Sequence, residues 1–477
     1  AVPGKLTLSL SAPLMSMMAD ELLSARCQRH LETLIALSEA ESARTRGEAT
    51  NAKLAAFYLE RFQNLHHFYV EELGRDVIGA FRRFFESGRI ELITCVGTHP
   101  ILPFQATEGG RRAQVRAACE LFESYFGRRP RGIWLAECAF SPGMDRFLAE
   151  EGICYSFLEE IGINAADSAP IYGNIAPLIS EHDVAFFGRD QLASAQVWSA
   201  SEGYPGDYFY REFYRDIGFD LPLEDIGPYI HPDGIRHNTG LKYNRITGDV
   251  ALGDKAPYDP EVAYHKAWEH GAHFVSERVE QGRRIAEQIG ERGSHMTCPY
   301  DAELFGHWWF EGPIFLEALF HRAAEQDELI MSSPVDFLGE VDVQQKTTPA
   351  TSTWGEDGYF AVWLDESNAW TYRHLRNAET MMVELATDFQ DAGGLQERAL
   401  RQAGREVLLA QSSDWPFIIK TGTTVEYAVA RIEEHVENFR LLHAGIRKDS
   451  IDEAFLADIE ARNNIFPNLD WKAWIEA

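Results

Sequence analysis

The chain has 477 residues, which is enough for one large domain with its own core and a smaller second domain. Asp and Glu outnumber Lys and Arg by 74 to 44, so the formal net charge is −30. Such a surface repels phosphate backbones and anionic lipids, and we expect neither a nucleic-acid nor a membrane partner. A neutral polymer such as a polysaccharide is not repelled.

The first part of the chain changes from a helical pattern to alternating strands and helices. A strand is predicted over 5–11, and apolar residues at i, i+3, i+4 and i+7 predict helices over about 18–87, interpreted as a helical insertion. The elements predicted beyond it are strands over 90–96, 132–135, 155–158 and 296–300, and helices over 111–125, 141–152 and 312–325. This alternation predicts a parallel sheet covered by helices, an α/β fold.

The second half of the chain has a different composition. Residues 183–255 are predicted to form a long loop rich in aromatic residues and glycine, and its first part, with Tyr204, is a candidate lid over a site. From about residue 366 helical patterns dominate. We therefore predict a boundary near 345, with an α/β unit over 1–345 and a helical domain over 346–477.

Cysteine usage and hydropathy bear on the cellular location. The six cysteines are spread singly, without a CxxC pair, which favours reduced thiols in a cytoplasm. The sequence has no run of about 18 apolar residues, and the first residues lack the apolar core of a secretory signal. The sequence therefore predicts a cytoplasmic protein without a transmembrane helix.

Two acidic residues come shortly after predicted strands. Glu137 comes after the strand over 132–135, and Asp301 follows the strand over 296–300. Because the carboxyl ends of parallel strands share one edge, these two acids can converge there. A carboxylate pair is the minimal machinery for cleaving a glycosidic bond, since one acid attacks the anomeric carbon and the other protonates the leaving oxygen. Two unrelated acids at neighbouring elements remain the alternative.

Other side chains favour a sugar ligand over a metal ion. His99 ends the strand over 90–96 and can hydrogen-bond a sugar hydroxyl, although a structural role is equally compatible with its position. Trp354 and Trp415 lie in polar, turn-rich segments and can pack on sugar rings. His270 and His273 share a helical face, but no acid completes a metal-binding set. We predict no metal site and, without a phosphate-binding motif, no cofactor.

Several longer segments resemble the branching-enzyme group of glycoside hydrolase family 57. They are WLAECAF at 134–140, GYPGDYFYREFYRDIGFDL at 203–221, GLKYNRITG at 240–248, PYDAELFGHWWFEGP at 299–313 and SSDWPF at 412–417. The resemblance implies an incomplete (β/α)7 TIM-like barrel with a helical insertion and a helical C-terminal domain that contributes to the glucan site. It also implies a first strand with a His-x-Pro motif before LTLSLSAPL, which we expect to be missing from this chain.

The resemblance also implies roles for individual residues. Glu137 matches the nucleophile, Asp301 the general acid/base, and His99 a residue of the donor-sugar site. Further matches lie near the bound glucan, and these are Arg211, Trp354, Trp363 and Asp414.

The implied activity is that of a retaining 1,4-alpha-glucan branching enzyme, which cleaves an α-1,4 bond and forms an α-1,6 branch in a glycogen-like glucan. A 4-alpha-glucanotransferase or alpha-amylase using the same carboxylates is an alternative. A non-catalytic glucan-binding protein is another, motivated by the expected loss of the first strand. A metal-dependent deacetylase requires a His-x-x-x-His set that we do not find near His99. The oligomeric state is left open.

Overall fold

A computed structural model describes residues 4–199, 203–231, 233–290, 292–341 and 344–476, and its centre is a short parallel sheet. The first sheet has the order β1-β2-β3, all parallel, with β1 (Leu6–Leu10), β2 (Ile90–Cys95) and β3 (Ile133–Trp134). The second has the order β4-β6-β5-β7, with β4 (Tyr155–Leu158), β6 (Ala185–Gly188), β5 (Leu178–Ile179) and β7 (Gln345–Lys346). The α/β class is therefore confirmed.

Isolated bridges extend the parallel arrangement beyond the two sheets. A parallel bridge between Gly132 and Tyr155 joins β3 to β4, and another between Arg189 and Thr297 continues it past β6. Among the strand pairs of the described residues, β5 and β6 are the antiparallel pair. β1 lies at an edge of its sheet, and the described residues place no strand on its outer side.

The register of the strands matches their buried, apolar sequences. Leu6 lies opposite Ile90, and Thr94 of β2 lies opposite Ile133 of β3. β2 and β4 are buried almost throughout, as expected for parallel strands covered on both faces. One covering helix, α5 (Glu108–Phe126), begins where the Thr107 hydroxyl accepts a hydrogen bond from a backbone N–H of the first turn.

The prediction of a strand over 296–300 is wrong. Within this segment only Thr297 pairs, through a single bridge to Arg189 just after β6, and Pro299 has no N–H with which to continue the ladder. The helix predicted over 141–152 is shorter and forms α6 (Asp145–Glu150). The predicted loop over 183–255 is partly ordered into β6, α8 (Gln191–Trp198), α9 (Ile217–Asp220) and α10 (Leu223–Ile226).

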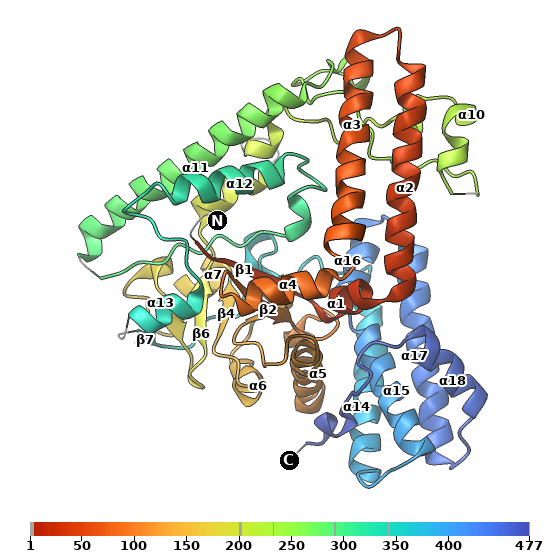
Figure 1. The fold of residues 1–477 in the computed structure, drawn as a ribbon. Helices are drawn as coiled ribbons and strands as arrows, with labels where there is room; N and C mark the ends of the chain where they lie inside the picture. The colour runs from red at the N-terminus through yellow and green to blue at the C-terminus, as the bar shows by residue number, and fades with distance from the viewer. Residues whose placement is uncertain (1–3, 200–202, 232, 291, 342–343, 477) are drawn as a thin grey trace.

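The helices expected over about 18–87 are present, but they begin at Ala12. They are α1 (Ala12–Ala19), α2 (Glu21–Arg44), α3 (Ala49–His67), a π-helical turn (Phe68–Glu72) and α4 (Val77–Glu86). Figure 1 shows α2 and α3 as a long antiparallel hairpin that projects from the sheet, whereas α1 and α4 lie beside the sheet. The Tyr58 hydroxyl on α3 donates to the Lys242 carbonyl, which fastens the hairpin to the segment after α10.

Two further helices line the large cavity that holds the candidate site. They are α11 (Pro260–Ile289), the longest described helix, and α12 (Gly312–Ala323), which pack against each other. Close packing depends on Gly271, because a Cβ there would lie 2.7 Å from the Cβ of Ala318. The short helices α7 (Glu160–Asn164) and α13 (Pro334–Glu340) complete this half of the fold.

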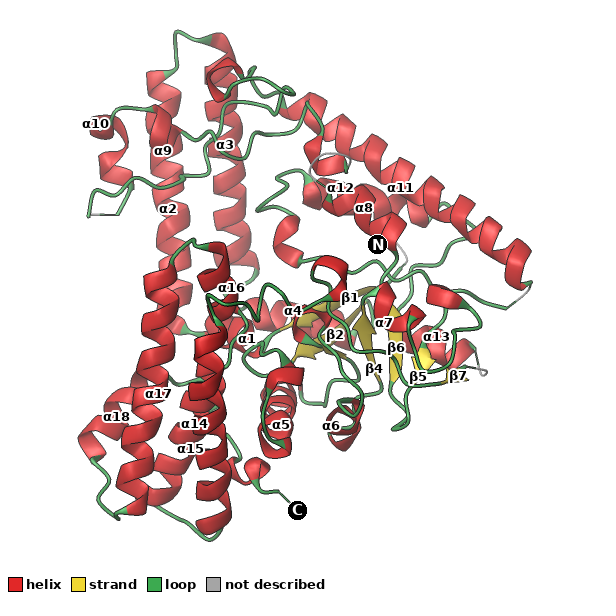
Figure 2. Ribbon diagram, turned by 180° about the vertical axis from the view of Figure 1, so that it is seen from behind, coloured by secondary structure: helices red, strands yellow, loops and turns green. Residues whose placement is uncertain are grey.

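The C-terminal region is helical, as predicted from about residue 366. Its helices are α14 (Ala369–Asp388), α15 (Leu395–Ala410), α16 (Asp414–Thr421), α17 (Val425–Arg447) and α18 (Glu453–Arg462), which form the bundle in Figure 2. One apolar core includes Leu92 of β2, Phe122 of α5 and Met382 of α14. This core joins residues from both sides of the predicted boundary near 345. The boundary itself stays a prediction.

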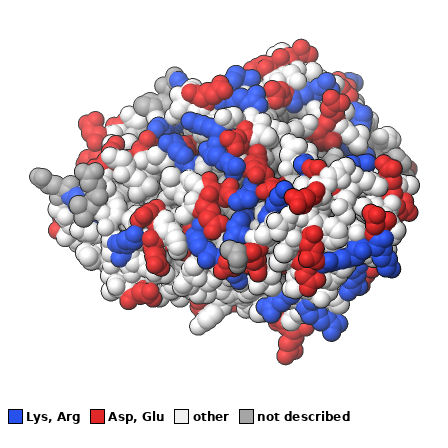
Figure 3. Space-filling model, turned by 90° about the horizontal axis from the view of Figure 1, so that it is seen from below, with Lys and Arg blue, Asp and Glu red and all other residues white. Residues whose placement is uncertain are grey.

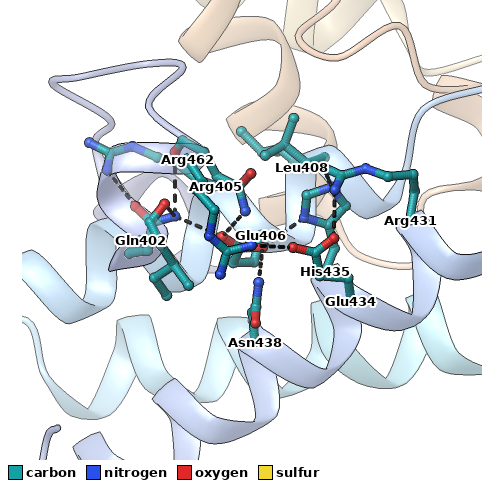
Figure 4. A network of polar contacts seen from close by, with 12 residues as sticks. Gln402, Arg405, Glu406, Leu408, Arg431, Glu434, His435, Asn438 and Arg462 are labelled. Atoms are coloured by element: carbon teal, nitrogen blue, oxygen red, sulfur yellow. Dashed lines mark hydrogen bonds and ion pairs between the residues drawn. The ribbon is translucent and has the colours of Figure 1, made fainter. Parts of the chain in front are cut away.

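A buried polar network lies inside this bundle (Figure 4). The Glu406 carboxylate on α15 is fully buried and accepts hydrogen bonds from His435, Asn438, Gln402 and Asn463. The network extends to α17, where the Arg431 guanidinium donates to His435 Nε2 at 2.9 Å. Since a guanidinium can only donate, His435 Nε2 accepts this bond, and Nδ1 carries the proton that is donated to Glu406.

Replacing Glu406 with Gln is expected to lower the free energy of unfolding by about 1–3 kcal/mol, because the new amide NH2 group faces buried donors. Although burial alone would raise it, hydrogen bonds, first that from His435, hold the pKa of Glu406 below its ordinary value. Its contribution to stability is therefore present at neutral pH and is lost as the pH falls through the lowered pKa. Denaturant unfolding at pH 7 checks this, with exposed Glu433→Gln as the control; equal stability of both variants contradicts it.

The surface carries mixed charges despite the acidic excess. On the face shown in Figure 3, basic and acidic side chains alternate, and no extended basic area is visible. Ion pairs such as Arg112–Glu150 at 2.8 Å and Arg129–Glu151 at 2.9 Å account for part of this mixing. Within the described residues, no helix combines the length and apolar character that crossing a membrane requires.

Candidate active site

Three side chains singled out in the sequence follow members of the parallel series at the same end. His99 follows β2, Glu137 follows β3, and Asp301 follows the single bridge at Thr297. All three line one cavity of about 2340 Å³. It continues along the outer edge of β1, where Leu6 and Leu8 line it.

Both carboxylate oxygens of Glu137 have hydrogen-bond donors. Trp354 Nε1 donates to Oε2 at 2.7 Å, and the Ser413 hydroxyl lies 3.3 Å from Oε1. The backbone of Glu137 has φ 60°, a left-handed conformation that is costly outside glycine. A further hydrogen bond of 3.0 Å, from the Trp354 amide to the Glu137 carbonyl, stabilises this turn. The carboxylate is thus held in one orientation with 16% of the side chain exposed.

His99 lies beside Glu137 and has the same unusual backbone, with φ 61°. Its Nδ1 atom is 2.8 Å from the Ser413 hydroxyl and 3.8 Å from Glu137 Oε1. The Ser413 amide donates to the His99 carbonyl at 2.9 Å, and Pro100 pairs with Ser412 in an antiparallel bridge. The loop after β2 is therefore joined directly to the start of α16 in the helical bundle.

The Asp301 carboxyl group is half-buried and lines the same cavity as Glu137. Burial, followed by the negative charges of Glu303 and Glu137, raises the pKa of Asp301 to about 6, and His99 and Arg189 oppose the rise. A carboxyl group with this pKa can donate a proton near neutral pH and take it back afterwards. The site thus combines one carboxylate held by two donors with a second that changes protonation near pH 6.

The remaining predicted residues divide into two sets. Trp354, Trp363 and Asp414 line the cavity with the carboxylates, although Trp363 is only 3% exposed. Trp354 is half-buried, with Trp134 against its ring at 5.1 Å and the Arg189 guanidinium 5.5 Å from it.

The members of the second set contact neighbouring segments of the chain. The Arg211 guanidinium lies 3.7 Å from the Phe310 ring and donates to the Gly240 carbonyl, although the residue also lines the cavity. Tyr204 stacks on His270 of α11, and Trp415 Nε1 donates to the Leu409 carbonyl. Within the described part of the chain, neither Tyr204 nor Trp415 lines the cavity.

Sequence reasoning missed three residues at this site. Ser413 lies in the SSDWPF segment, but only its neighbours Asp414 and Trp415 were singled out. Arg189 follows β6, a strand that was not predicted, and it is paired with Glu159 at 3.2 Å. Trp308 is 55% exposed, lines the cavity and stacks on Phe213 at 5.0 Å. Its place in PYDAELFGHWWFEGP, close after Asp301, was the available signal.

The histidines considered for metal binding have other partners. His273 Nδ1 lies 2.7 Å from the Tyr204 hydroxyl, and His270 Nδ1 lies 2.7 Å from that of Tyr210. Across the described ranges, no group of three or more His, Cys, Asp or Glu side chains is arranged to hold a metal ion.

Comparison with known proteins places the chain in a family. The family model "Glycosyl hydrolase family 57" matches residues 11–225, and the model "1,4-alpha-glucan branching enzyme, C-terminal" matches residues 374–474. The 1,4-alpha-glucan branching enzyme TK1436 of Thermococcus kodakarensis is 31% identical over 97% of this chain and 69% of its own length.

Two solved structures share the whole fold. The alpha-amylase AmyC from Thermotoga maritima is 36% identical with a TM-score of 0.93, covering 100% of this chain and 90% of that one. A family 57 branching enzyme from Pyrococcus horikoshii is 29% identical with a TM-score of 0.89, covering 100% and 88%. The chain belongs to glycosyl hydrolase family 57.

Proposed function

We propose that this protein is a 1,4-alpha-glucan branching enzyme, with Glu137 as the nucleophile and Asp301 as the general acid/base. The observation that carries the proposal is the pairing of a carboxylate held by Trp354 and Ser413 with an Asp301 of pKa about 6 in the same cavity. The match of residues 374–474 to the C-terminal region of branching enzymes favours branching over other transfers.

The reaction follows from these two groups. Glu137 attacks the anomeric carbon of an α-1,4 bond, that bond breaks, and Asp301 gives its proton to the leaving O4. The 6-hydroxyl of a second glucan chain then attacks the anomeric carbon, its proton passes to Asp301, and the bond to Glu137 breaks. Two successive displacements retain the α configuration.

We further propose an incomplete (β/α)7 barrel, a role in glycogen synthesis and a cytoplasmic location.

The remaining site residues serve to hold the glucan in this proposal. Asp414 and His99 line the cavity together with Glu137 and offer hydrogen bonds to sugar hydroxyls. Trp308, backed by Phe213, presents a ring face on which a neutral sugar can pack. Trp363 is only 3% exposed and packs beside Trp354, so its part in this proposal is to support the wall of the cavity. Arg211, Tyr204 and Trp415 support neighbouring segments through their contacts with Phe310, His270 and Leu409.

Product linkage tests the proposal. Purified protein is incubated with amylose, and the product is treated with an enzyme that cleaves only α-1,6 bonds before chain lengths are measured. New short chains released by debranching are expected. Longer chains without debranchable ends would instead identify a 4-alpha-glucanotransferase. Reducing sugar as the main product would identify an alpha-amylase, the activity named for the structure from Thermotoga maritima. Binding of glycogen without turnover would identify a glucan-binding protein.

Replacing Trp354 with Phe is expected to lower kcat for branching roughly 10- to 100-fold, since a hydrogen bond to a charged group contributes about 1.5–3 kcal/mol. Phe keeps an aromatic ring against Trp134 but removes the N–H that donates to Glu137. Steady-state kinetics on amylose measure the effect. Trp268→Phe on α11, outside the cavity lining, is the control, and equal kcat in the two variants contradicts a role for the indole N–H.

A further inference from the structure

The Ser413 hydroxyl lies between two groups of the active site. Its oxygen is 2.8 Å from His99 Nδ1 and 3.3 Å from Glu137 Oε1. Ser413 is only 1% exposed and comes from the helical bundle, whereas His99 and Glu137 follow strands of the sheet. A hydroxyl group has one proton to donate, so its two contacts cannot both be donations.

The identity of its partners decides which way the protons point. An ionised Glu137 can only accept, so the Ser413 hydroxyl must be the donor of that contact. The same oxygen then accepts from His99, which requires a proton on Nδ1. In the opposite arrangement the hydroxyl donates to His99, and its oxygen lone pairs face the negative charge of Glu137 without a proton between them. The first arrangement is therefore favoured.

The Ser413 hydroxyl has no structural task that competes with this one. Ser413 is the N-cap residue of α16, but its side chain makes no capping hydrogen bond. Its position is set by the backbone. The Ser413 N–H donates a hydrogen bond to the His99 carbonyl, and the neighbouring residues Pro100 and Ser412 form a bridge. Removing the hydroxyl thus leaves the contacts that hold the loop in place.

We infer that Ser413 is a positioning residue, which orients the Glu137 carboxylate and fixes His99 with its proton on Nδ1. With the proton on Nδ1, His99 Nε2 keeps a lone pair and accepts a hydrogen bond from a hydroxyl of the bound sugar. The helical domain thereby sets both the direction of the nucleophile and the hydrogen-bonding character of its neighbour. The role of Glu137 in this inference rests on the proposed function.

Histidine ring nitrogens report the tautomer without any turnover. Protein labelled with ¹⁵N-histidine is observed by NMR above the titration of the ring, and the His99 signals are assigned by their loss in His99→Gln. The wild-type protein is expected to show a protonated Nδ1. Ser413→Ala is expected to shift the population toward Nε2–H, whereas Ser413→Thr, which keeps a hydroxyl, retains the wild-type tautomer.

Kinetics on amylose give the second readout. Ser413→Ala is expected to lower kcat about 10-fold with little change in KM, because positioning acts on the transition state more than on binding. Ser413→Thr is expected to keep most of kcat. The control is Ser38→Ala, which removes a buried hydroxyl that donates to the Leu34 carbonyl within α2.

Three results overturn the inference: a wild-type His99 protonated on Nε2, a Ser413→Ala variant with wild-type kcat, or equal loss in both variants with an unchanged tautomer. A variant that fails to fold leaves the wild-type tautomer as the deciding measurement. A wild-type protein that shows no glucan transfer contradicts the proposed function instead, and the NMR result still decides the hydrogen bonding of Ser413.

Discussion

Glu137→Gln is expected to reduce glucan transfer by roughly 10⁴-fold or more, because the amide cannot form the covalent intermediate. The substitution fits the site, since the amide oxygen can accept from Trp354 while the amide nitrogen faces the Ser413 oxygen. Melting temperature should therefore remain close to that of the wild-type protein. Debranching of the amylose product measures the loss.

The control for this variant is Glu181→Gln, which neutralises an exposed carboxylate in the turn before β6. It should leave both activity and melting temperature unchanged. If Glu137→Gln branches amylose at a rate near that of the control, Glu137 is not the nucleophile, and the proposed scheme is wrong.

Asp301→Asn is expected to lower the rate on amylose by about 10²–10⁴-fold, the usual contribution of a general acid/base. An α-maltosyl fluoride substrate separates the two steps, because fluoride leaves without a proton. The variant should still form the covalent intermediate from the fluoride, and added azide, which needs no base, should restore turnover. Absence of azide rescue together with equal losses on amylose and fluoride contradicts the acid/base role.

The same residue predicts the pH dependence of bond cleavage. Asp301 must be protonated to act as an acid, and its pKa of about 6 means that the protonated fraction falls as the pH rises through that value. The kcat/KM for amylose should therefore decrease about tenfold per pH unit well above pH 6. This decrease should be absent when the pH dependence of kcat/KM is measured for Asp301→Asn with α-maltosyl fluoride. A wild-type profile that is flat from pH 6 to 8 contradicts the assignment.

Local patterns were sufficient to predict much of the fold. β1, β2, β3 and β4 lie within the predicted strands, because each is a short apolar run between helices. The segment over 296–300 has the same apolar character, yet only Thr297 pairs, since pairing depends on a neighbour at Arg189 and on the N–H that Pro299 lacks. The short helices within 183–255 were missed because each has only a few residues and depends on tertiary contacts for its stability.

The site was predictable to the extent that its residues follow strands. Glu137 and Asp301 come shortly after a strand and a bridge, so their shared edge could be inferred from the alternation of elements. The donors to Glu137 could not be inferred in this way. Trp354 and Ser413 act through contacts that no periodicity encodes, since they depend on how the bundle packs against the loop after β2.

These long-range donors have a consequence for protein synthesis. Trp354 and Ser413 lie 217 and 276 residues downstream of the carboxylate they hold. A ribosome must therefore translate at least as far as Ser413 before Glu137 gains both donors, even though the strands around it can fold earlier. The nascent chain therefore cannot hold the Glu137 carboxylate in its final orientation until α16 has left the exit tunnel and docked.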